Sequence, residues 1–337
     1  MENIIIIPSY EPKEKLINIV KQLKENNLNN IIVIDDGSTK KDIFNKLDDF
    51  CQVVHHEKNE GKGAAIKTGV NYAISNYKNI AGFVFLDGDG QHLIKDVKNV
   101  SDESLKTGKI VLGIRDFSSP LVPKKSKFGN KFSSIYFKIT TGIKLNDTQT
   151  GLRAIPYKYK EYLLNTEGKR YEYEMNFLMN IARNNIYIKT VPIETVYEDN
   201  NKESHFHAIR DSYLIYKEFI RFIFSAVSSS VIDVGLFYIF AHFTGFVFWP
   251  NIVARILSGI YNYTINKHWC FKSNGKYEYI GYFILFFIQM FASSLFVKLL
   301  SFVIGNLIIT KMLVDLVIFI VNYIIQKRFI FRSIKNV

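Results

Sequence analysis

Hydrophobic residues are distributed in two different ways along this 337-residue chain. Up to about residue 200, short apolar runs rich in β-branched and aromatic side chains alternate with longer stretches that carry charged residues at helical spacing. Parallel strands that are buried on both faces have this almost continuous apolar character, so the pattern predicts an α/β domain. The predicted strands are 4–7, 31–34, 53–55, 83–86 and 110–113, and helical patterns between them include 13–26 and 64–77.

The last third of the chain is different, because it contains four long apolar stretches. Each has about the 20 residues that a helix needs to cross a bilayer. We therefore predict a soluble α/β domain over 1–204, an interfacial helix over 205–219 and an all-α, four-helix transmembrane domain over 220–333. The interfacial helix is expected because aromatic and apolar residues are mixed there with arginine and lysine. The predicted spans are 219–243, 247–266, 279–301 and 307–326.

The transmembrane part repeats itself at an offset of 60 residues. The pattern Asn-Tyr-x-x-x-Lys-x-x-x-Phe-x-Ser that begins at Asn262 returns without a gap at Asn322. Apolar residues match by chance in such segments, but a repeated spacing of polar residues is not expected by chance. Each copy would hold two spans, so both copies should enter the membrane in the same sense, related by an axis along its normal.

Charge predicts the orientation of the chain. Lysine and arginine lie before the first span, between the second and third, and after the fourth, whereas the other two connections carry no charge. By the positive-inside rule, the α/β domain and both termini should face the cytoplasm, in an integral protein of the cytoplasmic membrane. The start at Met1 enters a predicted strand directly, so we expect no cleavable signal.

The net charge of +12 suits anionic lipid headgroups better than nucleic acid, because no basic stripe interleaved with aromatic residues is present in the α/β half. The two cysteines, Cys51 and Cys270, cannot form a disulfide framework, and we expect both to be packing residues. His205 and His207 could ligate a metal, but hydrogen bonding at the interface is the simpler interpretation. The sequence is compatible with both a monomer and a homo-oligomer.

Candidate chemistry lies where the predicted strands end. Polar and glycine residues at successive ends of parallel strands line one crevice of the sheet. Two carboxylates, Asp87 and Asp89, directly follow the apolar run 81–86, which is a position suited to a divalent cation. This arrangement favours transfer from a nucleotide donor beside a membrane. The segments concerned are Pro8-Ser9-Tyr10-Glu11, Asp35-Asp36-Gly37-Ser38, Asn59-Glu60-Gly61-Lys62-Gly63, Asp87-Gly88-Asp89 and Arg115-Asp116.

Each motif alone also has a simpler interpretation. Asp-Gly-Asp-Gly is often only a tight turn. An EF-hand is excluded, because the twelfth loop position counted from Asp87 is Lys98 and not a bidentate glutamate. A dinucleotide fingerprint at Gly61 is disfavoured, because Ile66 stands where the third glycine belongs, and no Walker loop is present.

Taken together and in this order, the motifs resemble the family 2 inverting glycosyltransferases of the Rossmann-like GT-A fold. Within them the chain is similar to the branch of dolichol-phosphate mannose synthases and bacterial polyprenyl-phosphate glycosyltransferases, and its membrane part resembles the GtrA-like family. The matching segments are Pro8-Ser9-Tyr10-Glu11, Asp35-Asp36-Gly37-Ser38, Asn59-Glu60-Gly61-Lys62-Gly63-Ala64, Asp87-Gly88-Asp89-Gly90-Gln91-His92, Gly113-Ile114-Arg115 and, most specific, Asp147-Thr148-Gln149-Thr150-Gly151-Leu152-Arg153.

The resemblance implies a set of site residues. Mg²⁺ or Mn²⁺ would be held by Asp87, Asp89 and Gln91. The residues expected to surround the nucleotide are Pro8, Tyr10, Glu11, Asp36, Lys62, Asp87 and Gly88. Those expected to bind the acceptor phosphate are Arg115, Arg153, Ser204 and Arg210. The catalytic set is Asp87, Asp89, Arg115, Asp147 and Arg153, with Glu172 and Glu174 as further candidates unless they only begin an amphipathic helix.

The predicted function is a metal-dependent, inverting transfer of a hexose from a UDP- or GDP-linked sugar to polyprenyl phosphate on the cytoplasmic leaflet. A phosphate nucleophile is largely ionised near pH 7, so a dedicated general base is less necessary. The alternative is a flippase or transporter of lipid-linked sugars with an accessory nucleotide-sugar-binding domain. A processive polysaccharide synthase is disfavoured, because the sequence lacks the Gln-x-x-Arg-Trp signature.

Charged residues within the predicted spans form a separate set of candidates. Charge is costly there and usually faces protein or a functional cavity. Asp233, Arg255 and Asp315 are expected to pair internally or to contact a lipid phosphate, whereas Lys298 and Lys311 could snorkel to a surface.

Overall fold

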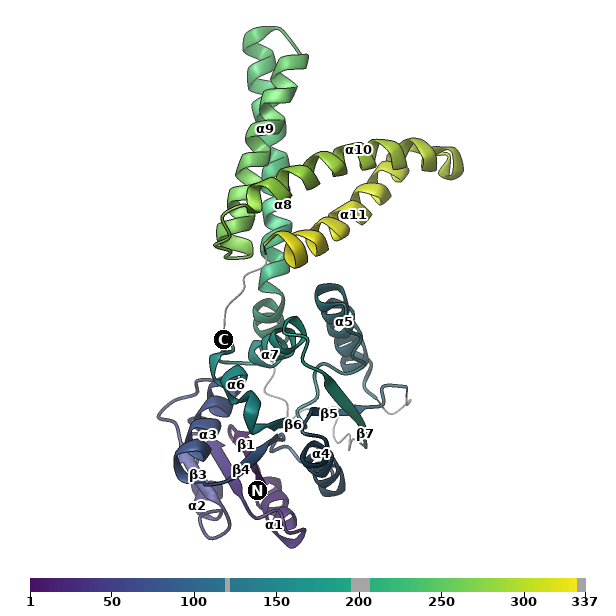
Figure 1. Ribbon diagram of the computed structural model, residues 1–337. Coiled ribbons are helices and arrows are strands. Elements are labelled where there is room, and N and C mark those ends of the chain that lie inside the picture. Colours follow the sequence, from purple (N-terminus) through teal and green to yellow (C-terminus); the bar gives the residue numbers. More distant parts are fainter. Residues whose placement is uncertain (119–121, 195–206, 332–337) are drawn as a thin grey trace. The chain divides into compact units, whose positions relative to one another are not determined.

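The computed structural model describes residues 1–118, 122–194 and 207–331 (Figure 1). The chain divides into two compact units, residues 1–215 and residues from 216 on. The prediction for Ser204 and His205 lies outside the described residues.

The first unit is built on a seven-stranded sheet with the order β3-β2-β1-β4-β6-β5-β7. Only β6 runs antiparallel to its neighbours β4 and β5, and the other pairings are parallel. The α/β class is thereby confirmed, and each of the five predicted strands is present. The strands are β1 (Glu2–Ser9), β2 (Ile31–Asp35), β3 (Gln52–His55), β4 (Ile80–Phe85), β5 (Ile110–Arg115), β6 (Arg153–Pro156) and β7 (Ile188–Ile193).

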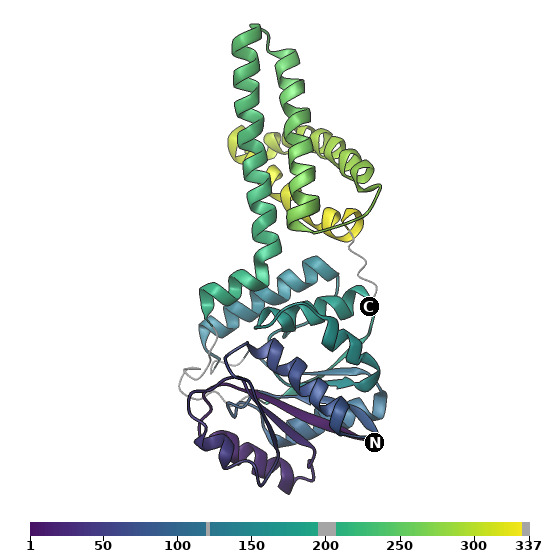
Figure 2. The ribbon, with the colours of Figure 1, turned by 90° about the vertical axis from the view of Figure 1, so that its left-hand side faces the viewer.

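Helices cover both faces of this sheet (Figures 1 and 2). Side chains alternate between the faces of a strand, so Ile5 and Ile7 join the buried cluster that includes Leu16 of α1 and Val97 of α4. Ile6 points the other way and lies against α3 at Gly69. The helices are α1 (Lys15–Glu25), α2 (Asp42–Asn45), α3 (Lys62–Asn76), α4 (Ile94–Thr107), α5 (Lys124–Thr141), α6 (Lys160–Asn165) and α7 (Glu172–Arg183), with a 3₁₀ turn at Tyr157–Tyr159.

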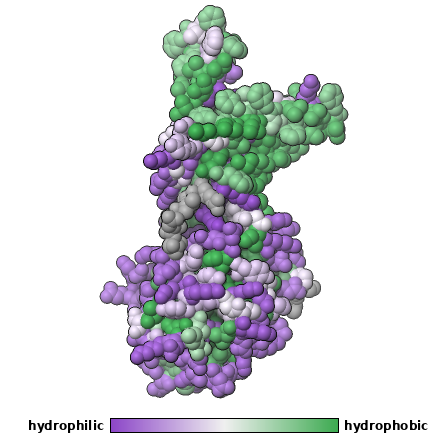
Figure 3. All heavy atoms as spheres, in the orientation of Figure 1, coloured by the Kyte–Doolittle hydropathy of each residue, from purple (hydrophilic) through white to green (hydrophobic). Residues whose placement is uncertain are grey.

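The second unit is helical. Its elements are α8 (Ala208–Thr244), which begins in the first unit, α9 (Phe248–Ile265), α10 (Glu278–Ile304) and α11 (Leu307–Ile325), with π-helical turns at Asn266–Cys270 and Gln326–Ile330. Within the described residues, three stretches are long and apolar enough to cross a membrane: Ile209–Thr244, Glu278–Ile304 and Leu307–Ile330. Few of their residues are buried inside the protein, and apolar side chains cover the surface of α10 in Figure 3. These surfaces suit contact with lipid.

Two details differ from the sequence expectations for this half. The helix α9 has 18 residues and is not among the three membrane-length stretches, because polar residues such as Asn251, Arg255 and Asn262 interrupt its apolar character. The fourth span therefore stays a prediction. The described part of the expected interfacial segment continues without a break into α8.

The sequence repeat is also a structural repeat. α8, α9 and the first π-helical turn correspond, at an offset of 60 residues, to α10, α11 and the second π-helical turn. The lysine of each copy contacts the glutamate of the other copy: Lys267 Nζ lies 3.3 Å from Glu278 Oε2, and Lys327 Nζ lies 2.5 Å from Glu218 Oε1. Such reciprocal contacts are the mark of an isologous, two-fold arrangement.

Equivalent residues of the two copies also meet each other, as expected for positions on a two-fold axis. Asn266 Nδ2 donates to Gln326 Oε1 at 3.0 Å. The rings of Phe271 and Phe331 stack with their centroids 5.2 Å apart. The two copies are therefore joined by their own repeated residues.

Candidate active site

The candidate site lies at the carboxyl ends of β2, β1 and β4, which are adjacent and parallel in the sheet. Carboxyl ends of parallel strands meet at one edge, so the segments that follow these strands are brought together. Glu11 joins two of them, because its Oε1 accepts hydrogen bonds from Thr39 N at 2.7 Å and Thr39 Oγ1 at 2.9 Å. These bonds lower the pKa of the Glu11 carboxyl. Glu11 has a φ of 46°, in the left-handed region.

Asp36 is buried, with 3% of its surface exposed, and its carboxylate organises the loop that leads into α3. Oδ1 accepts from Glu60 N at 2.9 Å, and Oδ2 accepts from Gly61 N at 2.8 Å. The ring of His56 lies 2.9 Å from Oδ1 and also contacts Thr68 Oγ1. Asp36 is among the residues expected to surround the nucleotide, and in the structure its oxygens accept from backbone N–H groups of the chain.

Asp35, just before it, is fully buried and held in the same way. Burial raises the pKa of this carboxyl, but hydrogen bonds from Lys41, His55 and Ser38 outweigh that effect and lower it. The two aspartates therefore fix the loops on either side of the strand ends.

An ionic cluster forms beside the end of β4. Lys62 Nζ, at the start of α3, lies 2.6 Å from Asp87 Oδ1 and 3.1 Å from Glu174 Oε1 on α7. Burial raises the pKa of the Asp87 carboxyl, but the Lys62 ammonium, His92 and Arg115 outweigh it and hold the pKa at about 2. Asp87 is therefore an anion at neutral pH. Burial lowers the pKa of the neighbouring His92 to about 4, so its ring is neutral.

The most specific sequence motif packs directly against this cluster. A Cβ added to Gly151 would lie 2.1 Å from Asp87 Oδ2, so only glycine leaves room for the carboxylate there. Arg153, at the other end of the motif, is buried and donates from Nε to Thr150 O at 2.8 Å. Its other nitrogens reach the carbonyls of Glu174 at 3.3 Å and Thr148 at 3.5 Å. Its position stabilises the motif loop.

Asp147 begins the same motif and orients Arg115. The guanidinium makes a bidentate contact, with Nε 2.7 Å from Oδ2 and Nη2 3.0 Å from Oδ1. Asp147 is fully buried and also accepts from the backbone of Arg115 and Gln149. A buried carboxylate paired in this way fixes the plane and direction of the guanidinium.

The remaining predicted residues take different positions. Pro8 lies in β1, Tyr10 follows it, and Gly88 follows β4, close enough to Ser9 that a Cβ would lie 2.8 Å from Ser9 Oγ. Arg210, on α8, donates to the adjacent Asp211 at 3.2 Å.

The residues proposed to hold a metal offer oxygen donors only. Asp89 Oδ1 accepts from Gln91 N at 3.0 Å, which folds the segment after β4 into a turn. Among the described residues, no three His, Cys, Asp or Glu side chains are grouped to hold an ion. Mg²⁺ and similar ions commonly take one or two carboxylates and complete their shell with substrate phosphates, so the pair Asp87 and Asp89 fits such an ion. The Lys62 ammonium beside Asp87 marks a position where positive charge is stable.

Sequence reasoning did not identify several of these contacts. His56 carries no motif signal, and its role follows from the fold alone. His92 directly follows the Asp-Gly-Asp-Gly-Gln segment, and Gly151 lies inside the most specific motif, so both could have been marked by position.

Comparison with known proteins finds a family match for each of the two units. Residues 4–160 match the family described as glycosyl transferase family 2, and residues 201–331 match the GtrA/DPMS transmembrane domain. The chain is 30% identical over 219 residues to UDP-N-acetylglucosamine–dolichyl-phosphate N-acetylglucosaminyltransferase of Methanococcus voltae, covering 58% of this chain and 86% of that protein. It is 24% identical over 220 residues to glycosyltransferase AglJ of Haloferax volcanii, covering 64% of this chain and 70% of AglJ.

Among solved structures, the chain is similar to glucosyl-3-phosphoglycerate synthase from Mycobacterium tuberculosis in complex with UDP. The sequence identity is 17%, the TM-score is 0.45, and the match covers 65% of this chain and 78% of that one.

The close approach of Gly151 and Asp87 gives a prediction. In Gly151→Ala, the new methyl group should push the flexible Asp87 carboxylate aside while leaving the fold intact. We expect binding of Mn²⁺, measured by electron paramagnetic resonance, to weaken at least about tenfold, the equivalent of about 1.4 kcal/mol. The control is Gly129→Ala in α5, where the nearest atoms lie 3.9 Å from the added Cβ. Unchanged Mn²⁺ binding in Gly151→Ala would show that this contact does not position Asp87.

Proposed function

Because this chain belongs to glycosyl transferase family 2 and carries a GtrA/DPMS transmembrane domain, we propose that it transfers a hexose from a nucleotide sugar to polyprenyl phosphate. The observation that carries the proposal is the group of Lys62, Asp87 and Gly151 at the edge where parallel strands end. The relative from Methanococcus voltae is named for transfer from UDP-N-acetylglucosamine to dolichyl phosphate. This name makes UDP-linked sugars the first donors to test, ahead of GDP-linked ones.

The donor would lie over the ends of β1, β2 and β4. A divalent cation, Mg²⁺ or Mn²⁺, held by Asp87, Asp89 and Gln91 would act as a Lewis acid on the diphosphate. Lys62 would add a point charge to the phosphates. Glu11 and Asp36 would shape the nucleotide pocket indirectly, since they hold the loops at Thr39 and at Glu60 and Gly61.

The acceptor phosphate would be bound by Arg115, whose guanidinium Asp147 already orients. One phosphate oxygen forms a bond to the anomeric carbon as the bond from that carbon to the nucleoside diphosphate breaks, so the configuration inverts. The phosphate is an anion before it reacts, and no proton has to be removed from it near pH 7. Positioning and charge stabilisation would therefore supply most of the catalysis.

Arg153 and Arg210 were both predicted to bind the acceptor phosphate. We propose that Arg153 acts mainly by holding the Asp147–Arg153 loop, because its N–H groups lie on backbone carbonyls. A phosphate contact of Arg210 stays a prediction, as does the transporter alternative.

The proposed orientation places the α/β unit and both termini in the cytoplasm. The membrane-length helices support a membrane protein. Lys267 and Lys327 occupy equivalent positions after α9 and α11, so the two-fold repeat brings both to the same end of the second unit. Basic residues at one end of a helical bundle favour the cytoplasmic side.

The acceptor is tested by product analysis. Membranes that contain the protein should convert labelled UDP- or GDP-linked sugars into an organic-soluble, acid-labile phosphodiester. A panel that contains several sugars on each nucleotide also identifies the donor. A water-soluble or polymeric product would contradict the proposed acceptor.

Metal dependence is a separate prediction. Chelation should abolish transfer, and Mg²⁺ or Mn²⁺ should restore it, because the leaving diphosphate needs neutralising charge. Asp89→Asn should lower kcat about 100-fold or more with the fold retained, which corresponds to about 2.7 kcal/mol of transition-state stabilisation. Asp116→Asn is the matched control, since the Asp116 carboxylate accepts from Ser118 N and Ser118 Oγ within the described residues. Full activity in chelator would exclude this site as the centre of reaction.

The pairing of Asp147 with Arg115 predicts a specific defect in acceptor binding. Asp147→Asn keeps the shape of the side chain but removes the charge that fixes the guanidinium. Hydrogen bonds to charged groups contribute about 1.5–3 kcal/mol, so we expect a loss of about 10- to 100-fold in kcat/KM for the acceptor. Nucleotide affinity, measured by calorimetry, should stay within about twofold. An equal loss of nucleotide binding would mean that Asp147 has a general structural role.

A further inference from the structure

Asp36, directly after β2, has a carboxylate whose hydrogen-bond acceptor sites can be counted. A carboxylate offers about four lone-pair sites, two on each oxygen. Oδ1 uses both of its sites, for Glu60 N at 2.9 Å and for the ring nitrogen Nδ1 of His56 at 2.9 Å. Oδ2 uses one, for Gly61 N at 2.8 Å. Among the described residues the Asp36 carboxylate has no further partner, so one acceptor site on Oδ2 is left.

The imidazole of His56 is itself fixed between two elements. A carboxylate only accepts hydrogen bonds, so Nδ1 of His56 is the donor. On the other side of the ring, Nε2 lies 2.9 Å from Thr68 Oγ1 on α3. Only 11% of the His56 side chain is exposed. The ring therefore occupies the second site of Oδ1 and leaves Oδ2 as the oxygen that is open to a ligand.

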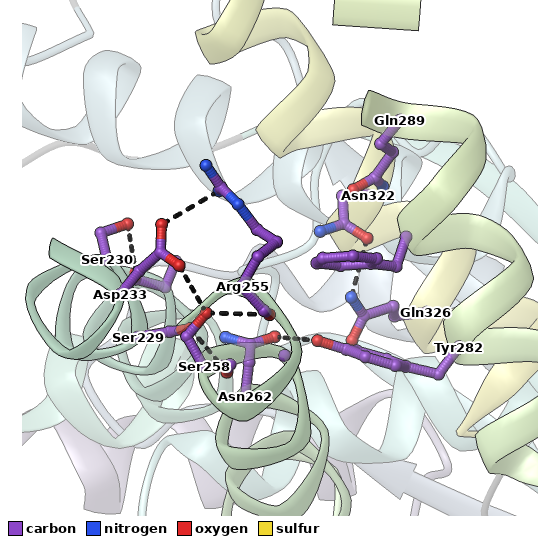
Figure 4. Close-up of a pocket in the computed structure, with 13 residues that line it drawn as sticks. Ser229, Ser230, Asp233, Arg255, Ser258, Asn262, Tyr282, Gln289, Asn322 and Gln326 are labelled. Carbon is purple, nitrogen blue, oxygen red and sulfur yellow. Dashed lines mark hydrogen bonds and ion pairs between the residues drawn. The ribbon is translucent and has the colours of Figure 1, made fainter. Parts of the chain in front are cut away.

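The partners of Asp36 differ from those of the aspartate that lines the pocket of the second unit. Figure 4 shows Asp233 paired with Arg255, whose Nη1 lies 3.2 Å from Asp233 Oδ2. In the parts of the chain that the structure describes, no lysine or arginine forms such a pair with Asp36. A carboxylate that is held by N–H groups alone is stabilised further by another N–H donor. The open site of Asp36 therefore favours an N–H group of a ligand.

The position of Asp36 suits recognition of a nucleotide base. The proposed function places the diphosphate of the donor at Lys62 and Asp87, beside the end of β4. In the sheet, β1 separates β4 from β2, so the ends of β4 and β2 lie two strand spacings, about 10 Å, apart. A donor that lies across these strand ends would place its ribose over β1 and its base at β2. In addition to holding the loop at Glu60 and Gly61, Asp36 would then meet the base.

Uracil and guanine present different edges to such a site. Uracil has one N–H group, at N3, whereas guanine has N1–H and the N2 amino group side by side. Guanine therefore needs both oxygens of a carboxylate, and an N–H group that is buried without an acceptor weakens binding. We propose that His56 restricts Asp36 to a base with a single N–H group, and so makes the protein select UDP-linked over GDP-linked sugars. This inference rests on the proposed function, and His56 is a positioning residue because it acts through Asp36.

The test measures nucleotide binding by calorimetry, with the full-length protein in lipid nanodiscs and Mg²⁺ present. The probes are UDP, N3-methyl-UDP, GDP and IDP, a purine nucleotide that has N1–H but lacks the N2 amino group. We expect UDP to bind at least about tenfold more tightly than N3-methyl-UDP, which cannot donate to Oδ2. We expect IDP to bind at least about fivefold more tightly than GDP, because the N2 amino group of GDP finds no acceptor. The comparison of IDP with GDP keeps the size of the base nearly constant.

Variants of His56 separate this role from simple support of the loop. In His56→Ala, Oδ1 regains an open acceptor site, so GDP should gain at least about fivefold in affinity relative to IDP. His56→Asn should keep the wild-type ratio, because its amide can donate to Oδ1 as Nδ1 does. The matched control is His55→Ala, since His55 Nδ1 lies 2.7 Å from Asp35 Oδ2 in the neighbouring pair. It should leave the ratios of all four affinities unchanged.

Three results would overturn the inference. Equal binding of UDP and N3-methyl-UDP would show that the N–H group of the base is not recognised. Absence of IDP binding would mean that the size of the base decides the selection. Equal weakening of all four nucleotides in His56→Ala would mean that His56 only holds the loop. If His56→Ala does not fold, the four affinities of the wild-type protein decide alone.

The inference and the proposed function can fail separately. The expected order of nucleotide affinities, without any transfer of sugar to polyprenyl phosphate, would contradict only the proposed function. Transfer to polyprenyl phosphate at equal rates from UDP- and GDP-linked forms of one sugar would contradict only the inference. Failure of the folded protein to bind any of the four nucleotides would contradict both.

Discussion

The Lys62 ammonium lies 2.6 Å from the Asp87 carboxylate at the edge where β2, β1 and β4 end. Charges that are partly removed from water are stabilised by pairing, and this pair links the start of α3 to the end of β4. Glu174 extends the contact to α7, and Gly151 leaves the space that the Asp87 carboxylate occupies. Four separate segments of the chain thus meet at one ionic cluster.

The sheet could be predicted where strands are apolar throughout, as in 31–34 and 83–86. β6 and β7 escaped prediction because each is short or interrupted: β6 begins with Arg153 and ends with Pro156, and β7 contains Lys189 and Pro192. β6 is antiparallel and lies inside the sheet, where its neighbours supply the hydrogen bonds that define it. Strand identity there comes from tertiary context and not from local pattern.

The candidate site was predictable as a set of motifs but not as a set of contacts. Sequence order identifies the segments that follow each strand, since their meeting is a property of parallel sheets. The contacts of Asp36 with Glu60 and Gly61 depend on how two loops approach each other. The same holds for Asp147 and Arg115, which are 32 residues apart and meet only in the folded chain. Residue types at a motif therefore indicate chemistry, and the fold decides which of them face a ligand.

The reciprocal contacts of the second unit have an evolutionary consequence. Lys267 meets Glu278 of the other copy, and Lys327 meets Glu218, so each two-helix half carries both members of the pair that joins it to its equivalent. A half of this kind is complementary to itself, and two separate copies could dock by the same contacts. Gene duplication followed by fusion would convert such a dimer into a single chain that keeps the same interface. The halves of such a fused chain can diverge, and in this chain Arg255 of one half corresponds to Asp315 of the other.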